Sequence, residues 1–418
     1  MEYIPRIGDG VLASRLRSAP MVVVEGPRAC GKTELARRQA ASVVRFDVDG
    51  AARAAAELNP SAILDLPRPV LLDEWQFAPS IWNQARRQSD DAGGVGHFIL
   101  TGSAVPPDDR TRHSGVGRVS RFRLRPMSLF ELGHSTGEAS LEALFARDSG
   151  HGTGRPELAL PDVIEMVCRG GWPATATADT ESAVDYVRDQ IEEICRTDIA
   201  SLEGPRHDPV RMRHLLVSLA RNVATEARLE TLSADVAEAG ETITTETVAA
   251  YLRSLQRLYV VEEQRHWSVS LRSRSRLRKS PKRHFADPSL AAAALGAGMA
   301  RLGRDMELLG LLFESLVVRD LRICAEPLRA SVFHYRDNTG LEADAVIEHP
   351  DGRWIAVEVK LGGQRAIESA ARSLLRLRDR VDTDRTGEPA ALVIVTATGY
   401  PLTRPDGVSV IPVTALGP

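Results

Sequence analysis

The sequence predicts an α/β protein of three parts, in which a helical segment separates two units that each alternate strands with helices. Short β-branched runs such as "MVVVE" alternate with helical segments up to about residue 130, a pattern typical of a mainly parallel sheet covered by helices. From Val163 to about Arg257 the pattern is helical, and an α/β pattern resumes near Met306. We place the predicted domains at 1–140, 160–290 and 300–418.

Length and charge set broad limits on what this chain can be. A chain of 418 residues is longer than one ordinary domain, and a hydrophobic fraction of 43% is ample for more than one core. Charged residues make up 26% of the chain, a normal share, and the formal net charge is −3. Any affinity for nucleic acid must therefore come from local basic patches and not from the charge of the whole chain.

Cysteine spacing and hydropathy point to the cytoplasm. The four cysteines are scattered without a CxxC pair, which favours neither a disulfide framework nor a zinc site and suits a reducing compartment. The first residues, "MEYIPRIGDG", lack the apolar stretch of a signal peptide, and no apolar run approaches the roughly 20 residues that span a bilayer. We expect a cytoplasmic protein with no membrane partner.

The first predicted strand leads into a glycine-bounded loop that matches G-x-x-x-x-G-K-[ST]. Such a loop curls so that successive N–H groups cradle phosphate oxygens at the start of the next helix. Lys32 would reach the β- and γ-phosphates, and the Thr33 hydroxyl would ligate Mg²⁺. The cofactors expected are ATP and Mg²⁺. The residues predicted to bind the nucleotide are Gly26, Pro27, Arg28, Ala29, Cys30, Gly31, Lys32, Thr33 and Glu34.

Two further predicted strands end in polar residues. "PVLLDEWQ" places Asp73 and Glu74 at the end of an apolar strand, where adjacent acids are costly unless they have a function. Asp73 would hold Mg²⁺ through water, and Glu74 would orient and deprotonate the attacking water. "HFILTGSA" ends in Thr101 and Ser103, which would sense the γ-phosphate. The alternative for the two acids is a strand that simply leaves the core.

These motifs, together with "YIPRIGDG" and "GRVSRFRLRPMSLFEL", resemble the prokaryotic AAA-type ATPases that carry a C-terminal domain of unknown function. The resemblance spans nearly the whole chain and implies an AAA-type P-loop sheet with Thr101 or Ser103 as sensor residues. Arg118 in "VGRVSR" matches a recurrent Gly-Arg of the family and is a candidate arginine finger. A finger acting in trans would require a homo-oligomer, and the alternative is a surface arginine.

The middle region predicts a helix, a turn, a second helix and a strand over residues 229–264. This is the outline of a winged helix, whose second helix can enter a major groove, although winged helices also bind proteins. The run 265–283 then sets eight Lys and Arg residues and no acid beside Trp267. Basic groups spaced in this way suit a phosphate backbone, so DNA is the predicted partner. The alternatives are an acidic partner and a solvated hairpin.

The last unit carries an acid–acid–lysine pattern. Asp344 begins an apolar run, and in "WIAVEVKL" the period of two places Glu358 and Lys360 on one strand face. Two acids near one Mg²⁺, here Asp344 and Glu358, could polarise a phosphodiester while the lysine steadies the developing charge. The order resembles the PD-(D/E)xK, or restriction-endonuclease-like, fold, in which Glu314 matches a supporting helix-borne acid. The alternative is an ordinary set of salt bridges.

Together these patterns predict a Mg²⁺-dependent ATP-hydrolysing enzyme of the AAA type that acts on nucleic acid through a winged helix and a nuclease-like domain. Cleavage of the nucleic acid is left open. The alternative function is a nucleotide-controlled switch that binds a protein partner and carries an inactive nuclease-like domain.

Overall fold

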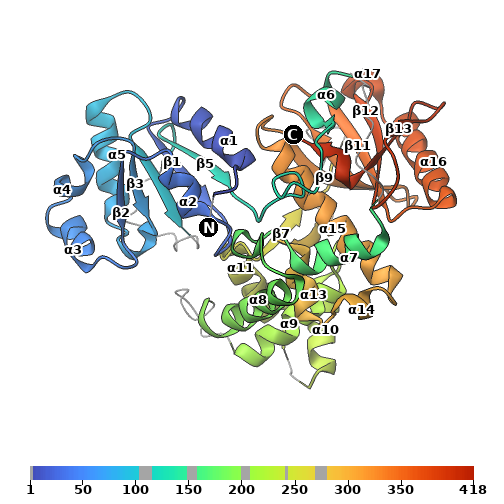
Figure 1. The fold of residues 1–418 in the computed structure, drawn as a ribbon, viewed down its shortest axis with the longest axis horizontal. Helices are drawn as coiled ribbons and strands as arrows, with labels where there is room; N and C mark the ends of the chain where they lie inside the picture. The colour runs from blue at the N-terminus through green and yellow to red at the C-terminus, as the bar shows by residue number, and fades with distance from the viewer. Residues whose placement is uncertain (1–2, 103–114, 148–157, 199–207, 241–242, 269–279) are drawn as a thin grey trace.

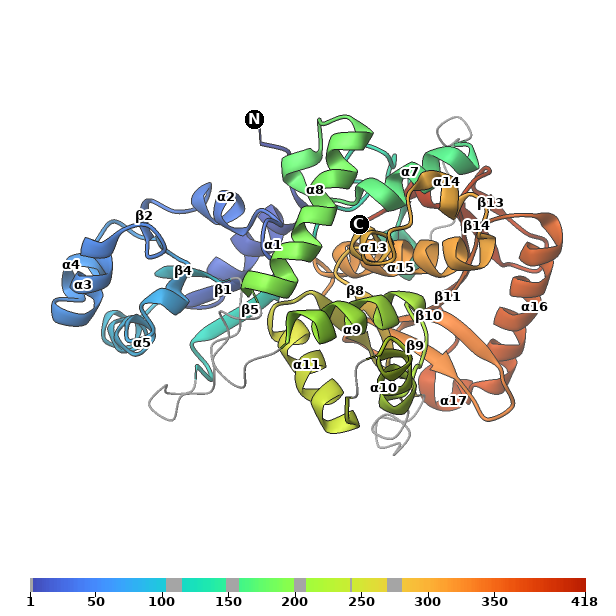
Figure 2. The ribbon, with the colours of Figure 1, turned by 90° about the horizontal axis from the view of Figure 1, so that it is seen from below.

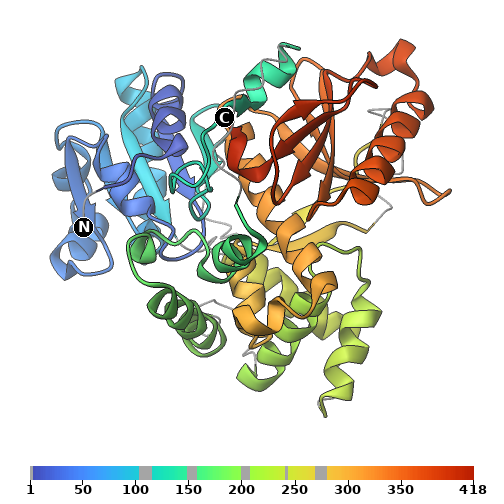
Figure 3. The same ribbon diagram turned by 45° about the vertical axis from the view of Figure 1, so that its right-hand side comes forward.

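The computed structural model describes the chain as two bodies joined by a short connection (Figure 1). The described residues are 3–102, 115–147, 158–198, 208–240, 243–268 and 280–418. The first body lies at the blue end of the chain and contains one sheet, and the second body contains the remaining helices and a larger sheet (Figure 3). The predicted sensor Ser103 and most of the basic run lie outside the described residues.

The first body is built on a parallel sheet with the strand order β2-β3-β4-β1-β5. All four strand pairings are parallel, so the carboxyl ends of the strands meet at one edge of the sheet. Strand β4 therefore lies between β1 and β3. The bounds are β1 Met21–Glu25, β2 Ser42–Arg45, β3 Val70–Asp73, β4 Phe98–Gly102 and β5 Val119–Arg123.

Helices cover both faces of this sheet, which explains why its strands are nearly continuous apolar runs. On one face Val22 and Val24 pack against α1 and α2, and on the other Met21 and Val23 pack against α3, α4 and α5. The bounds are α1 Ile7–Leu16, α2 Lys32–Arg37, α3 Gly50–Leu58, α4 Ser61–Leu64 and α5 Ile81–Ala92. The predicted parallel sheet with helical covers is confirmed for the first body.

After β5 the chain crosses into the second body. Leu129 already belongs to the second core, and β6 (Ala139–Ser140) pairs in parallel with β15 (Leu416–Gly417) near the C-terminus. Helix α6 (Leu141–Phe145) packs into the same core. Residues 129–140, which the predicted boundary assigns to the first domain, thus pack with the last strand of the chain.

The middle region is helical and ends in a two-stranded ribbon. Helices α9, α10 and α11 precede the antiparallel strands β7 and β8, which pair from Val261↔Phe285 to Gln264↔Lys282. The predicted order of helix, helix and strand is present, and DNA binding by it stays a prediction. The bounds are α7 Leu160–Arg169, α8 Thr180–Glu193, α9 Pro209–Arg221, α10 Leu229–Glu238, α11 Thr245–Arg257, β7 Val261–Gln264, β8 Lys282–Phe285, α13 Pro288–Ala294 and α14 Met299–Leu302.

The last unit is a six-stranded mixed sheet with the order β13-β14-β12-β11-β10-β9. Helix α15 packs on one face and α16 on the other. The bounds are α15 Met306–Ala325, β9 Ser331–Arg336, β10 Glu342–Glu348, β11 Trp354–Lys360, α16 Gln364–Arg380, α17 Thr383–Thr386, β12 Ala391–Thr396, β13 Leu402–Thr403 and β14 Ser409–Pro412.

The middle helices and the α15 face of this sheet share one apolar core. That core runs from Val163 and Leu216 in the middle region to Phe313 on α15 and Val357 on β11. Helix α15 therefore lies between the two units and packs against both (Figure 2).

Among the described residues, no helix is at once long and apolar enough to cross a membrane. The four cysteines are buried and free. The predicted cytoplasmic location stays a prediction.

Candidate functional site

The predicted phosphate loop lies at the carboxyl edge of the first sheet and packs tightly on the chain that follows β5. Gly26 and Gly31 have φ angles of 155° and 96°, which L side chains rarely adopt. A Cβ on Gly26 would lie 2.1 Å from the carbonyl oxygen of Leu124. Cys30 is fully buried, and its Sγ donates a hydrogen bond to the same carbonyl at 3.4 Å. The loop is therefore wedged against residue 124.

Lys32 is folded over its own loop. Its Nζ donates hydrogen bonds to the carbonyl oxygens of Gly26 at 3.0 Å and Pro27 at 2.7 Å, and the residue is 5% exposed. These acceptors are neutral, so phosphate oxygens, which are stronger acceptors for an ammonium group, can replace them. The lysine is already positioned inside the loop that it would serve.

Beneath the loop, one carboxylate accepts hydrogen bonds from two hydroxyl groups. Thr33 Oγ1 donates to Asp73 Oδ1 at 2.9 Å, and Thr101 Oγ1 donates to the same oxygen. This meeting follows from the strand order, because β4 carries Thr101 between the loop after β1 and the end of β3. Burial raises the pKa of Asp73, and the hydroxyl bonds from Thr101 and Thr33 oppose that rise.

The donor set beneath the loop fits a magnesium ion. Magnesium prefers oxygen ligands and keeps several waters, so a threonine hydroxyl and one carboxylate are suitable partners. Asp73 is 1% exposed, and Thr33 is partly buried beside it. These are the two residues that the sequence predicts as metal ligands in the first body.

Glu74 follows Asp73 in a strained conformation. Its φ of 52° places a non-glycine residue in the left-handed region, which costs energy and is frequent at functional sites. Its backbone N–H donates to Thr101 Oγ1 at 3.3 Å, and its carboxylate accepts a hydrogen bond from Gln76. Glu74 is thus fixed at the same sheet edge as the phosphate loop.

Two other predicted residues lie away from the loop. Glu34 pairs with Arg37 at 2.8 Å, and both side chains are exposed. Arg118 directly precedes β5, and its carbonyl oxygen accepts a hydrogen bond from the N–H of Met21, at the amino end of β1. Its Nε pairs with Asp90 at 2.7 Å. It lies at the sheet edge opposite the loop and therefore does not reach a nucleotide on its own chain. A finger acting in trans stays a prediction.

Arg6 contacts the phosphate loop, and the sequence analysis does not single it out. Its Nη1 donates to the carbonyl oxygen of Cys30 at 3.0 Å and its Nη2 to that of Arg125 at 2.8 Å. Its Nε pairs with Glu131 at 3.0 Å, and both side chains are almost fully buried. The only signal is its place in the stretch "YIPRIGDG", which contributes to the family resemblance.

A second candidate site is a cavity of about 420 Å³ in the second body. Its lining includes the predicted trio Asp344, Glu358 and Lys360 together with Glu314 of α15. Asp344 lies where the register between β10 and β9 shifts from Ala343 to Val346, and such bulges re-aim side chains. The structure thus brings together residues that the sequence separates by up to 46 positions.

Contacts within the trio are close. Lys360 Nζ lies 2.6 Å from Glu358 Oε2 and 3.3 Å from Asp344 Oδ2. The backbone N–H of Val359 donates to Asp344 Oδ2 at 2.8 Å. The alternation predicted for β11 is therefore confirmed, since Glu358 and Lys360 share one side of the strand.

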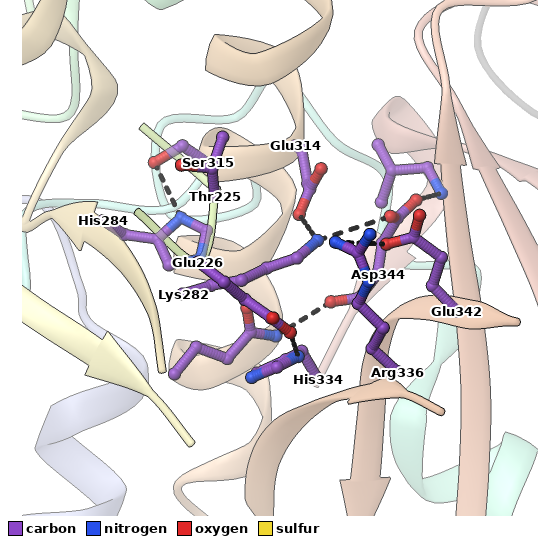
Figure 4. A network of polar contacts seen from close by, with 12 residues as sticks. Thr225, Glu226, Lys282, His284, Glu314, Ser315, His334, Arg336, Glu342 and Asp344 are labelled. Atoms are coloured by element: carbon purple, nitrogen blue, oxygen red, sulfur yellow. Dashed lines mark hydrogen bonds and ion pairs between the residues drawn. The ribbon is translucent and has the colours of Figure 1, made fainter. Parts of the chain in front are cut away.

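A second lysine enters this cavity from the middle region (Figure 4). Lys282 of β8 places its Nζ 2.6 Å from Glu314 Oε1 and 3.6 Å from Asp344 Oδ1. The sequence analysis includes Lys282 in the basic run predicted to contact DNA, whereas the residue is 7% exposed and faces the cavity. All four residues of "KRHF" are buried in β8, so no alternation in the sequence separates Lys282 from the rest of the run.

Other members of the basic run are also buried. Trp267 is 2% exposed, donates from its ring nitrogen to Glu348 at 2.9 Å and packs on Trp354 with ring centroids 4.9 Å apart. Trp267 is thus a core residue and not a stacking platform for bases. Arg283 is buried, and Arg265 is exposed. The arginines and the lysine between 269 and 279 lie outside the described residues.

Burial and the charges of the cavity shift the pKa values of its acidic residues in opposite directions. Burial, helped by the charge of Asp344, raises the pKa of Glu314 to about 8 and the pKa of Glu358 to about 8. Burial would also raise the pKa of Asp344, but Lys282 and Lys360 hold it below its usual value. Asp344 is therefore the firmly ionised carboxylate of the cluster.

As arranged, this cluster does not fit a divalent cation. Each of the three carboxylates already faces an ammonium group, and among the residues that the structure describes no three Asp, Glu, His or Cys side chains form a group able to hold a metal. Metal binding by Asp344 and Glu358 stays a prediction, and in the present arrangement the ammonium group of Lys360 opposes it.

Comparison with known families addresses the first body directly. Residues 18–133 match the family described as "AAA domain". The first body thus contains a domain of the AAA type. The next two matches are families described as domains of unknown function, DUF8612 over residues 160–301 and DUF4143 over residues 309–416. The predicted AAA-type domain is confirmed, and the winged-helix and nuclease-like assignments stay predictions.

Similar proteins are known from mycobacteria and an archaeon. Two uncharacterized proteins, from Mycobacterium bovis and Mycobacterium tuberculosis, are each 26% identical over 372 residues, covering 87% of this chain and 75% of the relative. A solved Walker-type ATPase of Pyrococcus abyssi aligns with 14% identity and a TM-score of 0.45, over 70% of this chain and 96% of that one.

Proposed function

We propose that this protein binds Mg²⁺–ATP at the loop 26–33, hydrolyses it, and uses the cycle to act on nucleic acid. One observation carries the ATPase part: the hydroxyls of Thr33 and Thr101 meet on the buried carboxylate of Asp73 directly beneath the loop. Thr33 belongs to the loop and Thr101 ends the neighbouring strand β4, so the carboxylate collects the polar groups of two elements at the edge of the sheet where the nucleotide is proposed to bind.

The roles follow from position. Lys32 exchanges its loop carbonyls for the β- and γ-phosphate oxygens, and Thr33 and Asp73 hold the metal. When bound, magnesium neutralises charge on the β- and γ-phosphates. Glu74, fixed after Asp73, orients a water and accepts its proton. Thr101 links the two acids, since it donates to Asp73 and accepts from the N–H of Glu74.

ATP binding and turnover of purified variants test this assignment. Lys32→Ala should lose nucleotide binding, and Glu74→Gln should bind ATP while turnover falls by about 10²-fold or more. Arg37→Ala is the matched control, because Arg37 is exposed on the same helix and pairs with Glu34. Normal turnover in Glu74→Gln would remove Glu74 from the mechanism.

Phosphodiester cleavage at the second cavity is a second candidate function, favoured by the convergence of Asp344, Glu358 and Lys360. Plasmid would be incubated with the protein, ATP, and Mg²⁺ or Mn²⁺. Metal-dependent nicking that disappears in Asp344→Ala supports cleavage. ATP turnover without nicking or DNA retention supports the alternative, a nucleotide-controlled switch for a protein partner.

A further inference from the structure

The second cavity is not built by the last unit alone, because a strand of the middle region supplies one of its charges. Lys282 lies on β8 and reaches between Glu314 on α15 and Asp344 on β10 (Figure 4). An ammonium group at this point neutralises the carboxylates that would otherwise attract a cation. Together with Lys360, which faces Asp344 and Glu358, Lys282 leaves each of the three carboxylates against an ammonium group, and the cluster as arranged does not fit a divalent metal.

The ribbon that carries Lys282 is anchored at the same place by its other strand. Gln264 of β7 is the register partner of Lys282. Its Nε2 donates to the carbonyl oxygens of Asp344 and Phe333, each at 2.9 Å, on the two sides of the bulge. Its Oε1 contacts His284 Nε2 at 3.0 Å, and His284 Nδ1 contacts Ser315 Oγ at 3.2 Å. Lys282 can therefore move away from Asp344 with its ribbon only if the hydrogen bonds of Gln264 to Asp344 and Phe333 are broken.

The other end of β7 is tied to the ATPase domain. Glu262, two residues before Gln264, pairs with Arg125 at 2.9 Å and with Arg123 at 3.4 Å. In the sequence, these two arginines lie on either side of Leu124. Gly26 and Cys30 of the phosphate loop pack against the carbonyl oxygen of Leu124. The carbonyl oxygen of Arg125 also accepts from Arg6, which in turn contacts the loop at Cys30. A continuous set of buried contacts thus joins the phosphate loop to the ribbon.

We propose that Lys282 is a latch that keeps divalent metal out of the second cavity, and that nucleotide bound at the phosphate loop withdraws it through Glu262 and the β7–β8 ribbon. The coupling to nucleotide rests on the proposed ATPase function, whereas the exclusion of metal does not. Withdrawal of the Lys282 ammonium frees Asp344 Oδ1 and leaves Asp344 and Glu358 sharing one ammonium group, that of Lys360, so that carboxylate oxygens suited to a hard cation face the cavity.

Titration of the full chain with Mn²⁺ alone, followed by electron paramagnetic resonance of the free ion, tests the latch. Lys282→Met should bind one Mn²⁺ at least about tenfold more tightly than the unmodified protein, because a positive charge that repels the ion is gone. Lys282→Arg keeps the charge and should not gain affinity. Adding Asp344→Asn to Lys282→Met should abolish the gain.

A folding control is needed because Lys282→Met leaves Glu314 without its partner. The double variant Lys282→Met/Glu314→Gln removes that uncompensated charge and keeps Asp344 and Glu358, so it should show the same gain. Thermal unfolding verifies that each variant is folded. If neither variant gains Mn²⁺ affinity over the unmodified protein, or if Lys282→Arg gains as much as Lys282→Met, the latch is wrong.

The nucleotide arm repeats the titration with a non-hydrolysable ATP analogue. With the analogue, the unmodified protein should bind Mn²⁺ more tightly at the second cavity. Binding at this cavity is identified as the part that Asp344→Asn removes. Glu262→Gln should show no such gain in affinity. If Lys282→Met gains Mn²⁺ affinity while the analogue leaves the Mn²⁺ affinity of the unmodified protein unchanged, then Lys282 excludes metal but nucleotide does not control it. Absence of ATP turnover would overturn the proposed function without affecting the titration with metal alone.

Discussion

At the scale of single residues, two buried lysines differ in what holds them. Lys32 donates to neutral carbonyl oxygens of its own loop, whereas Lys282 lies against the carboxylates of Glu314 and Asp344. Hydrogen bonds to charged acceptors are roughly twice as strong as those to neutral ones. Lys32 is therefore ready to exchange partners when a phosphate arrives, while Lys282 moves only if its strand moves.

A first prediction at the residue scale concerns the hydroxyl group of Thr33. Thr33→Val keeps the shape of the side chain and removes the donor to Asp73. We expect the affinity for Mg²⁺–ATP to fall by about 1.5–3 kcal/mol, while affinity for metal-free ATP changes little. Calorimetric titration with and without EDTA measures both, and Thr33→Ser, which keeps the hydroxyl, is the control. Equal loss with and without magnesium would contradict the role of Thr33 as a metal ligand.

The environment of Glu262 lets us predict how the free energy of unfolding depends on pH. Burial alone would raise the pKa of Glu262, but Arg125, Arg123 and Arg322 hold it well below its usual range. A carboxyl group with a depressed folded-state pKa stabilises the protein above its unfolded pKa, about 4.3, and this contribution is lost as pH falls towards the folded value.

Urea unfolding at several pH values tests this. At pH 7, Glu262→Gln should be less stable by about 3–5 kcal/mol, since Arg125 and Arg322, which are largely buried, and the partly exposed Arg123 lose their counter-charge. The difference between the two proteins should shrink steadily below pH 4. A difference that stays constant down to pH 3 would mean that Glu262 contributes by packing and not by charge.

At the scale of elements, α15 performs two tasks on opposite sides. One side presents Glu314 to the second cavity. Further along, Arg319 pairs with Asp287 at 2.6 Å and Asp320 at 2.7 Å, and Asp320 accepts the N–H of Leu129 at 2.9 Å. One buried helix thus fixes the connection between the two bodies and one wall of the cavity.

Replacing the central charge of that helix should be costly. Arg319→Leu leaves Asp287 and Asp320 buried without a cation, and we expect a loss of about 3–5 kcal/mol in the free energy of unfolding. Urea denaturation followed by circular dichroism measures it. Arg304→Leu, at an exposed position just before the helix, should stay within about 0.5 kcal/mol. Similar losses in both variants would show that the Arg319 ion pairs contribute little.

At the scale of the whole molecule, the two bodies have separate apolar cores and meet through buried polar contacts. Arg6 with Glu131, and Arg125 with Glu262, cross the junction. These few directional contacts are the route that the proposed coupling between the phosphate loop and the second body would use.

Nucleotide should consequently stabilise both bodies together. Mg²⁺–ADP at 100 times its dissociation constant should raise the free energy of unfolding by about 2.7 kcal/mol, and Lys32→Ala should abolish the effect. Differential scanning calorimetry of Glu131→Gln should resolve two transitions, with only the one that belongs to the ATPase domain raised by nucleotide. A single transition that still shifts in this variant would remove Glu131 from the coupling.

The sequence by itself determined the contiguous features of this protein. The loop Gly26–Thr33 and the acids after β3 are recognisable because all their chemistry lies within a few consecutive residues. Strand alternation likewise placed Glu358 and Lys360 on one side of β11, since side-chain direction in a strand depends only on position.

Only the tertiary structure decided which distant charges meet. Lys282 lies 62 positions before Asp344, within a basic run that the sequence analysis assigns to contact with DNA. Its burial follows from the pairing of β8 with β7 and the docking of Gln264 on the bulge, which depend on long-range packing. Strand direction likewise decided that Arg118 lies at the sheet edge opposite the phosphate loop of its own chain, so only a role in trans stays a prediction.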